Sequence, residues 1–241
     1  MRNITYEFDI HKDTRQYLLQ LQHFTIVIVC DDSGSMMTPV KGTRKTRWNQ
    51  LHEIVKKVIQ IALIFDPDGV DIHFLNGGKY PKVKHSREID QVFERIPTGY
   101  TPLVPVLTGI FQSPMTRRGR DKKLLVFVVT DGKPTNDDGL DMVSELEDLM
   151  RHTRDEETTY VSFLLCTDEP ECVVYLEKWD RTMKNVNVTD NYDTELRKIR
   201  HCQENGNISF TKDDYIMKAL IGVILPRIDR LNERKRETIF T

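Results

Sequence analysis

Apolar runs typical of buried β-strands alternate along this chain with segments of helical periodicity. Three segments contain nearly unbroken apolar stretches with many β-branched residues: FTIVIVC at 24–30, KKLLVFVVTDG at 122–132 and TTYVSFLLC at 158–166. A strand that is apolar on both faces is typical of a parallel sheet that helices cover on both sides. These segments therefore predict the centre of a mostly parallel sheet.

The longest helical pattern runs from Arg47 to Phe65, where the apolar residues fall on one face. Thr46 is suited to cap the start of this helix, and Pro67 is suited to stop it. The segment VDIHFLNGG that follows predicts another strand. Its Gly77-Gly78 pair predicts a turn into an antiparallel edge strand.

The remaining segments predict shorter elements. Helical patterns occupy 86–96, 101–111, 140–152, 171–179, 194–202 and 214–232, the last with a break expected at Pro226, and a short final strand is expected at 184–190. Strand and helix alternate without an internal repeat or a linker. We therefore expect an α/β fold with a doubly wound, mostly parallel central sheet, one antiparallel edge strand and helices on both faces.

Size and charge narrow the functional classes. The chain has 241 residues, 39% of them hydrophobic, which suffices for one sizeable core. Its 35 basic and 37 acidic residues leave a net charge of -2, so no basic field favours nucleic acid as a partner. The longest apolar stretch, Tyr215 to Leu225, is too short for a membrane span.

The cysteines and the first residues favour a reducing, intracellular setting. Cys30 and Cys166 each end an apolar run and are expected to be buried thiols, and no CxxC spacing occurs. The opening segment, MRNITYEFDIHKDTRQ, is too polar for a secretory signal. We expect a cytoplasmic protein.

Two of the expected central strands end in aspartate, Asp31 and Asp131. Doubly wound sheets bind ligands beyond the carboxyl ends of their strands, where the strand order reverses, so these carboxylates are expected to converge. Two carboxylates at the edge of a core repel each other, and a divalent cation between them removes that penalty. Ser33 and Ser35 follow at spacings that let the loop curl round one centre, and Gly34 allows the tight turn. Carboxylate and hydroxyl oxygens suit Mg²⁺ and not zinc.

Three motifs carry a family resemblance: DDSGSM after the first strand, TGYTPL in the middle of the chain and VVTDGKPT after a later strand. Together they resemble the von Willebrand factor A (VWA) domain and its metal-ion-dependent adhesion site. The resemblance implies an N-terminal extension at 1–23, a VWA domain at 24–225 and a C-terminal helical tail at 226–241. It implies Mg²⁺ as the ion, with Mn²⁺ or Ca²⁺ as substitutes. The metal-ligand positions of the family fall here on Asp31, Ser33, Ser35, Thr101 and Asp131.

The resemblance implies that water mediates some contacts between these residues and the ion, so the two carboxylates leave a dication partly unneutralised, with a coordination position for an outside oxygen. We therefore expect a protein partner that supplies Asp or Glu, with Thr101 coordinating directly in the engaged form, as the resemblance implies. The basic segment KGTRKTR, Lys41 to Arg47, is expected to be a solvated loop on the metal-bearing face. Tyr100 stands where the family often has Gly, so it is expected to shape the partner surface.

Other functions fit parts of the same pattern. A VWA-fold scaffold subunit of an intracellular complex, with a mainly structural ion, shares the whole motif. A Mg²⁺-dependent phosphatase of the haloacid dehalogenase type needs a general acid two residues after its aspartate nucleophile, where this chain has Ser33. A serine hydrolase needs Gly-x-Ser-x-Gly, which DDSGSMM lacks. We expect no enzymatic activity.

Overall fold

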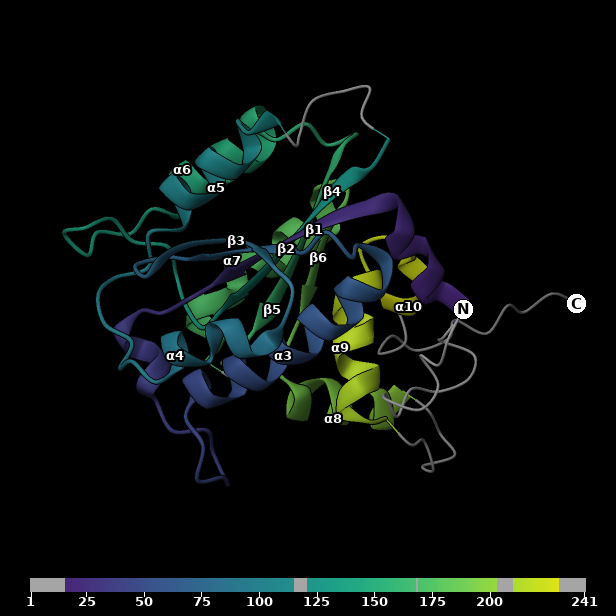
Figure 1. Ribbon diagram of the computed structural model, residues 1–241. Helices are drawn as coiled ribbons and strands as arrows, with labels where there is room; N and C mark the ends of the chain where they lie inside the picture. The colour runs from purple at the N-terminus through teal and green to yellow at the C-terminus, as the bar shows by residue number, and fades with distance from the viewer. Residues whose placement is uncertain (1–15, 115–120, 168, 203–209, 230–241) are drawn as a thin grey trace, which may run out of the picture.

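The structure is a computed structural model that describes residues 16–114, 121–167, 169–202 and 210–229. Six strands of the described chain form one sheet in the order β3-β2-β1-β4-β5-β6 (Figure 1). They are β1 (Phe24–Cys30), β2 (Val70–Phe74), β3 (Gly78–Val83), β4 (Lys123–Thr130), β5 (Thr159–Leu165) and β6 (Val186–Thr189). Neighbouring strands are parallel except β2 and β3, which are antiparallel. The expected mostly parallel sheet with one antiparallel edge strand is confirmed.

The two central strands, β1 and β4, pair along their lengths and place side chains on both faces of the sheet. In β1, Ile26 and Ile28 belong to the core on one face, and Val27 and Val29 belong to the core on the other. This alternation follows from the two-residue period of a strand. Because both faces are buried, the sequence of each strand has to be apolar at almost every position.

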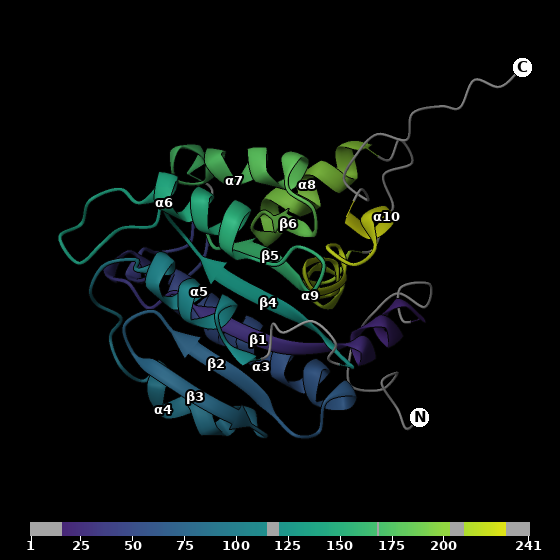
Figure 2. The ribbon, with the colours of Figure 1, turned by 90° about the horizontal axis from the view of Figure 1, so that it is seen from above.

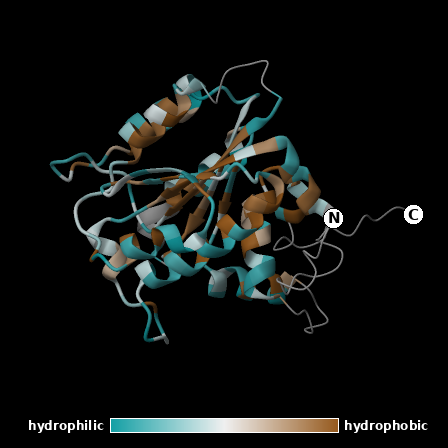
Figure 3. Ribbon diagram, viewed as in Figure 1, coloured by the Kyte–Doolittle hydropathy of each residue, from teal (hydrophilic) through white to brown (hydrophobic). Residues whose placement is uncertain are grey.

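Helices cover both faces of the sheet (Figure 2). The first core includes residues of α3 (Arg47–Phe65), α4 (Asp90–Phe93), α9 (Lys212–Ile221) and α10 (Pro226–Asp229). The second core includes residues of α5 (Leu103–Phe111), α6 (Val143–Asp148) and α7 (Pro170–Thr182). The helix α8 (Tyr192–Cys202) follows β6 and precedes α9. Figure 3 shows the hydrophobic residues concentrated on the sheet and on the helix faces turned toward it.

Several element boundaries differ from those expected. The helix α3 begins and ends as expected, and Thr46 caps it by accepting a hydrogen bond from the Asn49 backbone N–H. The 140–152 pattern begins as a helix only at Val143 and continues as a π-helical turn, and the 86–96 pattern forms a 3₁₀ turn followed by α4. The 214–232 pattern divides into α9 and α10, with the interruption directly before Pro226.

The packed core extends to residues before the first strand. A 3₁₀ helix spans Gln16–His23, and its Leu18 and Leu21 are fully buried in the same core as Phe24. The rest of the expected N-terminal extension, 1–15, and the end of the expected C-terminal tail, 230–241, lie outside the described residues. Cys30 and Cys166 are buried free thiols, as expected. Within the described ranges, no helix combines the length and the hydropathy that crossing a bilayer requires.

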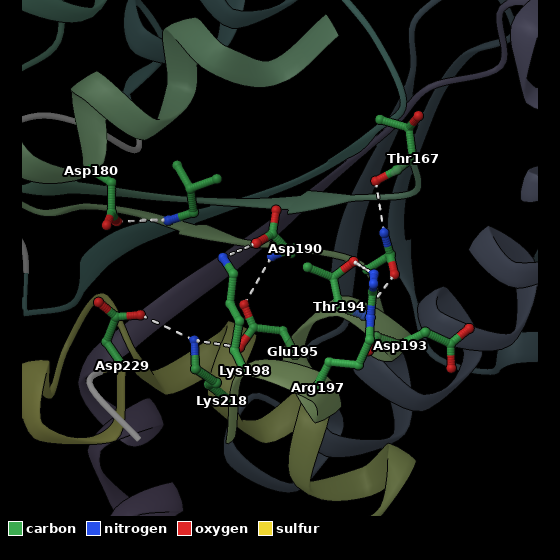
Figure 4. Close-up of polar contacts among 12 residues, drawn as sticks. Thr167, Asp180, Asp190, Asp193, Thr194, Glu195, Arg197, Lys198, Lys218 and Asp229 are labelled. Atoms are coloured by element: carbon green, nitrogen blue, oxygen red, sulfur yellow. Dashed lines mark hydrogen bonds and ion pairs between the residues drawn. The ribbon is translucent and has the colours of Figure 1, made fainter. Parts of the chain in front are cut away.

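A buried charged network joins the end of β6 to the last three helices (Figure 4). Lys218 of α9 is 1% exposed, and its Nζ lies 3.2 Å from Asp229 Oδ1 of α10 and 3.4 Å from Glu195 Oε2 of α8. Glu195 also accepts a hydrogen bond of 3.2 Å from the backbone N–H of Asp190, which follows β6. The sequence pattern did not predict this network, because the three charged residues lie in separate helices.

Candidate metal centre

The candidate site lies at the carboxyl ends of β1 and β4, which run side by side (Figure 2). The chain adds β2 and β3 on one side of β1, and it adds β5 and β6 on the other side of β4, so the strand order reverses here. Asp31 and Asp131 directly follow these strands, and each is 1% exposed. The backbone N–H of Asp31 donates to Val129 O at 3.0 Å and holds the two strand ends in register.

Hydrogen bonds connect four of the five predicted ligands. The Ser33 backbone N–H donates to Asp31 Oδ1 at 3.0 Å, and the Ser33 and Ser35 hydroxyl oxygens lie 3.0 Å apart. The Ser35 hydroxyl donates to Asp131 Oδ1 at 2.8 Å, across 96 residues of sequence. The loop after β1 therefore curls so that its serines bridge the two aspartates.

The fifth predicted ligand, Thr101, joins this group through the backbone of its loop. Gly34 N–H donates to Gly99 O at 3.1 Å, which brings the loop before Thr101 against the serine loop. Thr101 N–H donates to the Thr135 hydroxyl at 2.9 Å, and Thr135 N–H donates back to Thr101 O at 2.9 Å. In the described structure Thr101 is buried, and the hydrogen bonds that hold it are those of its backbone.

Asp31 carries an unfavourable charge. Burial, followed by the negative charge of Asp131, raises the pKa of Asp31 from 3.8 to about 6. Hydrogen bonds from Ser33 and from the Thr130 hydroxyl, which donates to Asp31 Oδ2 at 2.6 Å, oppose this rise. The carboxylate is therefore ionised at neutral pH at a free-energy cost, and a cation near both aspartates would remove that cost.

Asp131 has a cationic partner inside the protein. The Arg47 guanidinium donates from Nη1 to Asp131 Oδ2 at 2.8 Å and from Nη2 to Glu169 Oε1 at 2.6 Å. The Arg47 side chain is only 8% exposed. The expectation of a solvated basic loop is therefore wrong for Arg47, because α3 begins at this residue and turns its side chain toward the strand ends. Lys41 and Arg44 are exposed, as expected.

Three further polar contacts of the site were not expected from the sequence. Thr130 is the polar last residue of β4 and follows a run of six buried apolar residues, and a fully buried hydroxyl in such a place needs a partner, which here is Asp31. Asp32 accepts from the backbone N–H of Asn76 at 2.7 Å and from its side-chain amide at 3.1 Å. The same amide donates to Tyr100 O at 3.0 Å. Asn76 thus links Asp32, at the start of the loop after β1, to the loop that carries Tyr100.

The donor set suits a hard cation. Two carboxylates and three hydroxyls offer oxygen ligands, and Mg²⁺ accepts a site with few carboxylates when water completes its six positions. Within the described residues, no group of three or more His, Cys, Asp or Glu side chains could hold a metal ion. An ion bound here would therefore depend on the serine and threonine hydroxyls and on water.

Exposed apolar side chains lie on the loops of this site. Met37 follows Ser35 by two residues, Tyr100 precedes Thr101, and Leu140 lies in the loop after Asp131; all three are exposed. The Tyr100 ring lies against Gly139, where an added Cβ would be 2.8 Å from a ring carbon. The loops thus present apolar surface around a polar centre.

Comparison with protein-family models and with curated proteins finds no match. Three solved structures of pilus proteins are similar to parts of the chain. One is the adhesive tip pilin GBS104 from Group B Streptococcus agalactiae, with 17% identity, a TM-score of 0.33 and 46% coverage of either chain. Another is the pilus adhesin RrgA from Streptococcus pneumoniae, with 13% identity, a TM-score of 0.33 and coverage of 46% of this chain and 20% of that one.

The third is the pilus adhesin SpaC from Lactobacillus rhamnosus GG in its open conformation. It has 13% identity, a TM-score of 0.46 and coverage of 81% of this chain and 30% of that one. The chain therefore spans less than half the length of each of these structures. At these identities and TM-scores the likeness carries no argument about the function of this chain.

Proposed function

We propose that this chain is a metal-dependent protein-binding module of the VWA type. In this proposal Mg²⁺ is held by Asp31, Ser33, Ser35, Thr101 and Asp131, and it takes the carboxylate of an Asp or Glu from a partner protein. The observation that carries the proposal is the hydrogen-bonded group of residues 31, 33, 35 and 131 across the ends of two neighbouring strands. A bound ion would supply a positive centre with an open oxygen position.

The charges of the site support an outside carboxylate as the ligand. Asp31 and Asp131 are the only carboxylates in the proposed ligand set, and the hydroxyls of Ser33, Ser35 and Thr101 add no charge. The two aspartates formally balance the two charges of the ion, and the ligand set contains no further negative charge. Arg47 compensates part of the charge of Asp131, so an anionic side chain from a partner improves the balance.

The surface around the site supports a protein partner. Met37, Tyr100 and Leu140 present exposed apolar area beside the polar centre. Aromatic and methionine side chains are enriched in protein interfaces, and a small anion would make no use of them. We therefore expect the acidic residue of the partner to be flanked by apolar residues.

A scaffold subunit with a mainly structural ion is the alternative function. The salt bridge between Arg47 and Asp131 favours it, because this salt bridge already supplies one aspartate with a cation. The two functions differ in whether partner binding needs the ion. Cytoplasmic location and the absence of enzymatic activity stay predictions.

Calorimetric titration with Mg²⁺ and with Mn²⁺ tests the metal site. We expect the native chain to bind both ions and Asp131→Asn to bind at least about tenfold more weakly, since an uncharged amide replaces a carboxylate ligand. Asp137→Asn is the matched control, because Asp137 is an exposed aspartate of the same loop. If native protein binds no Mg²⁺ at millimolar concentration, the proposal is wrong.

Affinity capture with and without a chelator then tests partner binding. The captured protein is identified, and its acidic residues are replaced by the corresponding amides one at a time. We expect chelator, Asp131→Asn and one of the partner substitutions each to abolish capture. Capture that is indifferent to chelator would favour the scaffold. Turnover of a generic phosphate ester that Asp31→Asn abolishes would instead favour an enzyme.

A further inference from the structure

Arg47 is the first residue of α3, and two features fix its position. Thr46 and Asn49 make a reciprocal pair of hydrogen bonds that defines where the helix begins. The Arg47 backbone N–H donates to Thr38 O at 3.0 Å, so the loop before the helix is also held. The guanidinium beside Asp131 is therefore set by the fold and is not a chance surface contact.

The two contacts of this guanidinium differ in their surroundings. The side chains of Arg47 and Asp131 are 8% and 0% exposed, whereas that of Glu169 is 56% exposed. Water and salt screen an exposed pair much more than a buried one. The salt bridge with Asp131 is therefore the stronger of the two, and Glu169 mainly orients the far side of the guanidinium.

The aspartates of the site are neutralised unequally. Asp131 receives the Ser35 hydroxyl on Oδ1 and Arg47 on Oδ2. Asp31 receives neutral donors on both oxygens. A dication that binds through Asp131 Oδ2 competes with Arg47 for that oxygen, and one that binds through Oδ1 alone lies near a fixed positive charge. In both cases Arg47 opposes metal binding.

We propose that Arg47 is a built-in counter-ion that stabilises the metal-free site and weakens its affinity for a dication. The inference rests on the proposed function, because it takes Asp31 and Asp131 to be metal ligands. The same guanidinium gives the occupied site one additional positive charge. It therefore strengthens the attraction for a carboxylate from outside while it lowers the affinity for the ion.

Substitution of Arg47 by Met removes the charge and keeps an unbranched side chain. By calorimetry we expect Arg47→Met to bind Mg²⁺ and Mn²⁺ about 10- to 100-fold more tightly than native protein, since a unit charge several ångströms from the ion is gone. With a chelator present, the variant is expected to melt at a lower temperature than native protein. Added Mg²⁺ should raise its melting temperature by more than it raises that of native protein.

Two further variants separate charge at the site from other effects. Arg44→Met removes an exposed charge of the same segment, and we expect its Mg²⁺ affinity to stay within about twofold of native, because solvent screens the charge. Arg47→Lys keeps the charge, and we expect it to return the affinity toward the native value. If Arg47→Met does not fold, Arg47→Gln, which keeps N–H donors without charge, serves for the same comparison.

The outcomes distinguish this inference from the proposed function. If native protein binds Mg²⁺ and Arg47→Met binds it equally or more weakly, Arg47 has only a structural role and the inference is wrong, while the proposed function stands. If neither protein binds, both are wrong. If only Arg47→Met binds, the inference is supported, and the native site is not a resident metal site.

Discussion

The ionised state of Asp31 has a measurable cost in the metal-free protein. Burial and the charge of Asp131 raise the pKa of Asp31 from 3.8 to about 6. One pKa unit corresponds to about 1.4 kcal/mol, so ionising Asp31 in the folded protein costs about 3 kcal/mol relative to the unfolded chain. Asp31→Asn removes this cost. The amide oxygen can still accept from the Ser33 N–H, and the amide NH₂ can donate to the Thr130 hydroxyl.

The cost depends on pH in a defined direction. Because the pKa of Asp31 is higher in the folded than in the unfolded state, the folded state binds more protons between about pH 4 and pH 6. The contribution of Asp31 to the free energy of unfolding of native protein therefore falls as the pH rises through that window, and the full cost of ionising Asp31 is present above about pH 6. Asp31→Asn lacks this dependence.

Urea unfolding at a series of pH values, with a chelator present, measures the effect. We expect Asp31→Asn to be more stable than native protein by about 1–3 kcal/mol at pH 7.5 and to show little difference near pH 4. Asp137→Asn, at an exposed site of a neighbouring loop, should match native protein at each pH. An Asp31→Asn variant that is less stable than native at pH 7.5, or a difference that is constant with pH, would refute the reasoning.

Three further substitutions test other parts of the structure. Lys218→Met leaves the buried Glu195 of α8 without its cation, so we expect the free energy of unfolding, measured in urea, to fall by about 3–5 kcal/mol. A fall below about 1 kcal/mol would contradict this. Thr130→Val removes a hydrogen bond to the ionised form of Asp31, so Mn²⁺ binding should need a higher pH; an unchanged pH profile would be evidence against that role. Gly99→Ala introduces a side chain at φ +92°, close to the Asn76 side-chain amide, and should lower the free energy of unfolding by about 1–3 kcal/mol. Gly42→Ala, at φ +73° in open space, should lower it by less. Equal losses of stability in the two variants would exclude a role for the close contact.

The strands were predictable because their signal is local. In β1 and β4 almost every position has to be apolar when helices cover both faces, and that requirement is visible in a run of seven or eight residues. The start of α3 was equally local, because the Thr46 cap acts on a residue three positions away. Interactions of this range leave a pattern in the sequence itself.

Boundaries failed where loop hydrogen bonds replaced helical ones. The pattern from Leu140 predicted helix, but the Asn136 side chain accepts from the backbone N–H groups of Asp138 and Leu140 and holds this segment as a loop. The apolar Leu140 is consequently exposed instead of packed. The position of an apolar residue therefore did not reveal whether it faces the core or the surface beside the site.

By itself the sequence predicted the α/β architecture, the order of most elements and four residues of the candidate site, Asp31, Ser33, Ser35 and Asp131, while Thr101 was implied only by the family resemblance. It could do so because strand periodicity, helix capping and the loop after β1 act over a few residues, and because parallel strands bring their carboxyl ends to one edge. Only the tertiary structure decided which charges are buried. Four basic residues between Lys41 and Arg47 are equivalent in sequence, and the packing of α3 against the strand ends selects Arg47 as the partner of Asp131. Burial depends on the surfaces that distant segments bring together, and no local pattern encodes it.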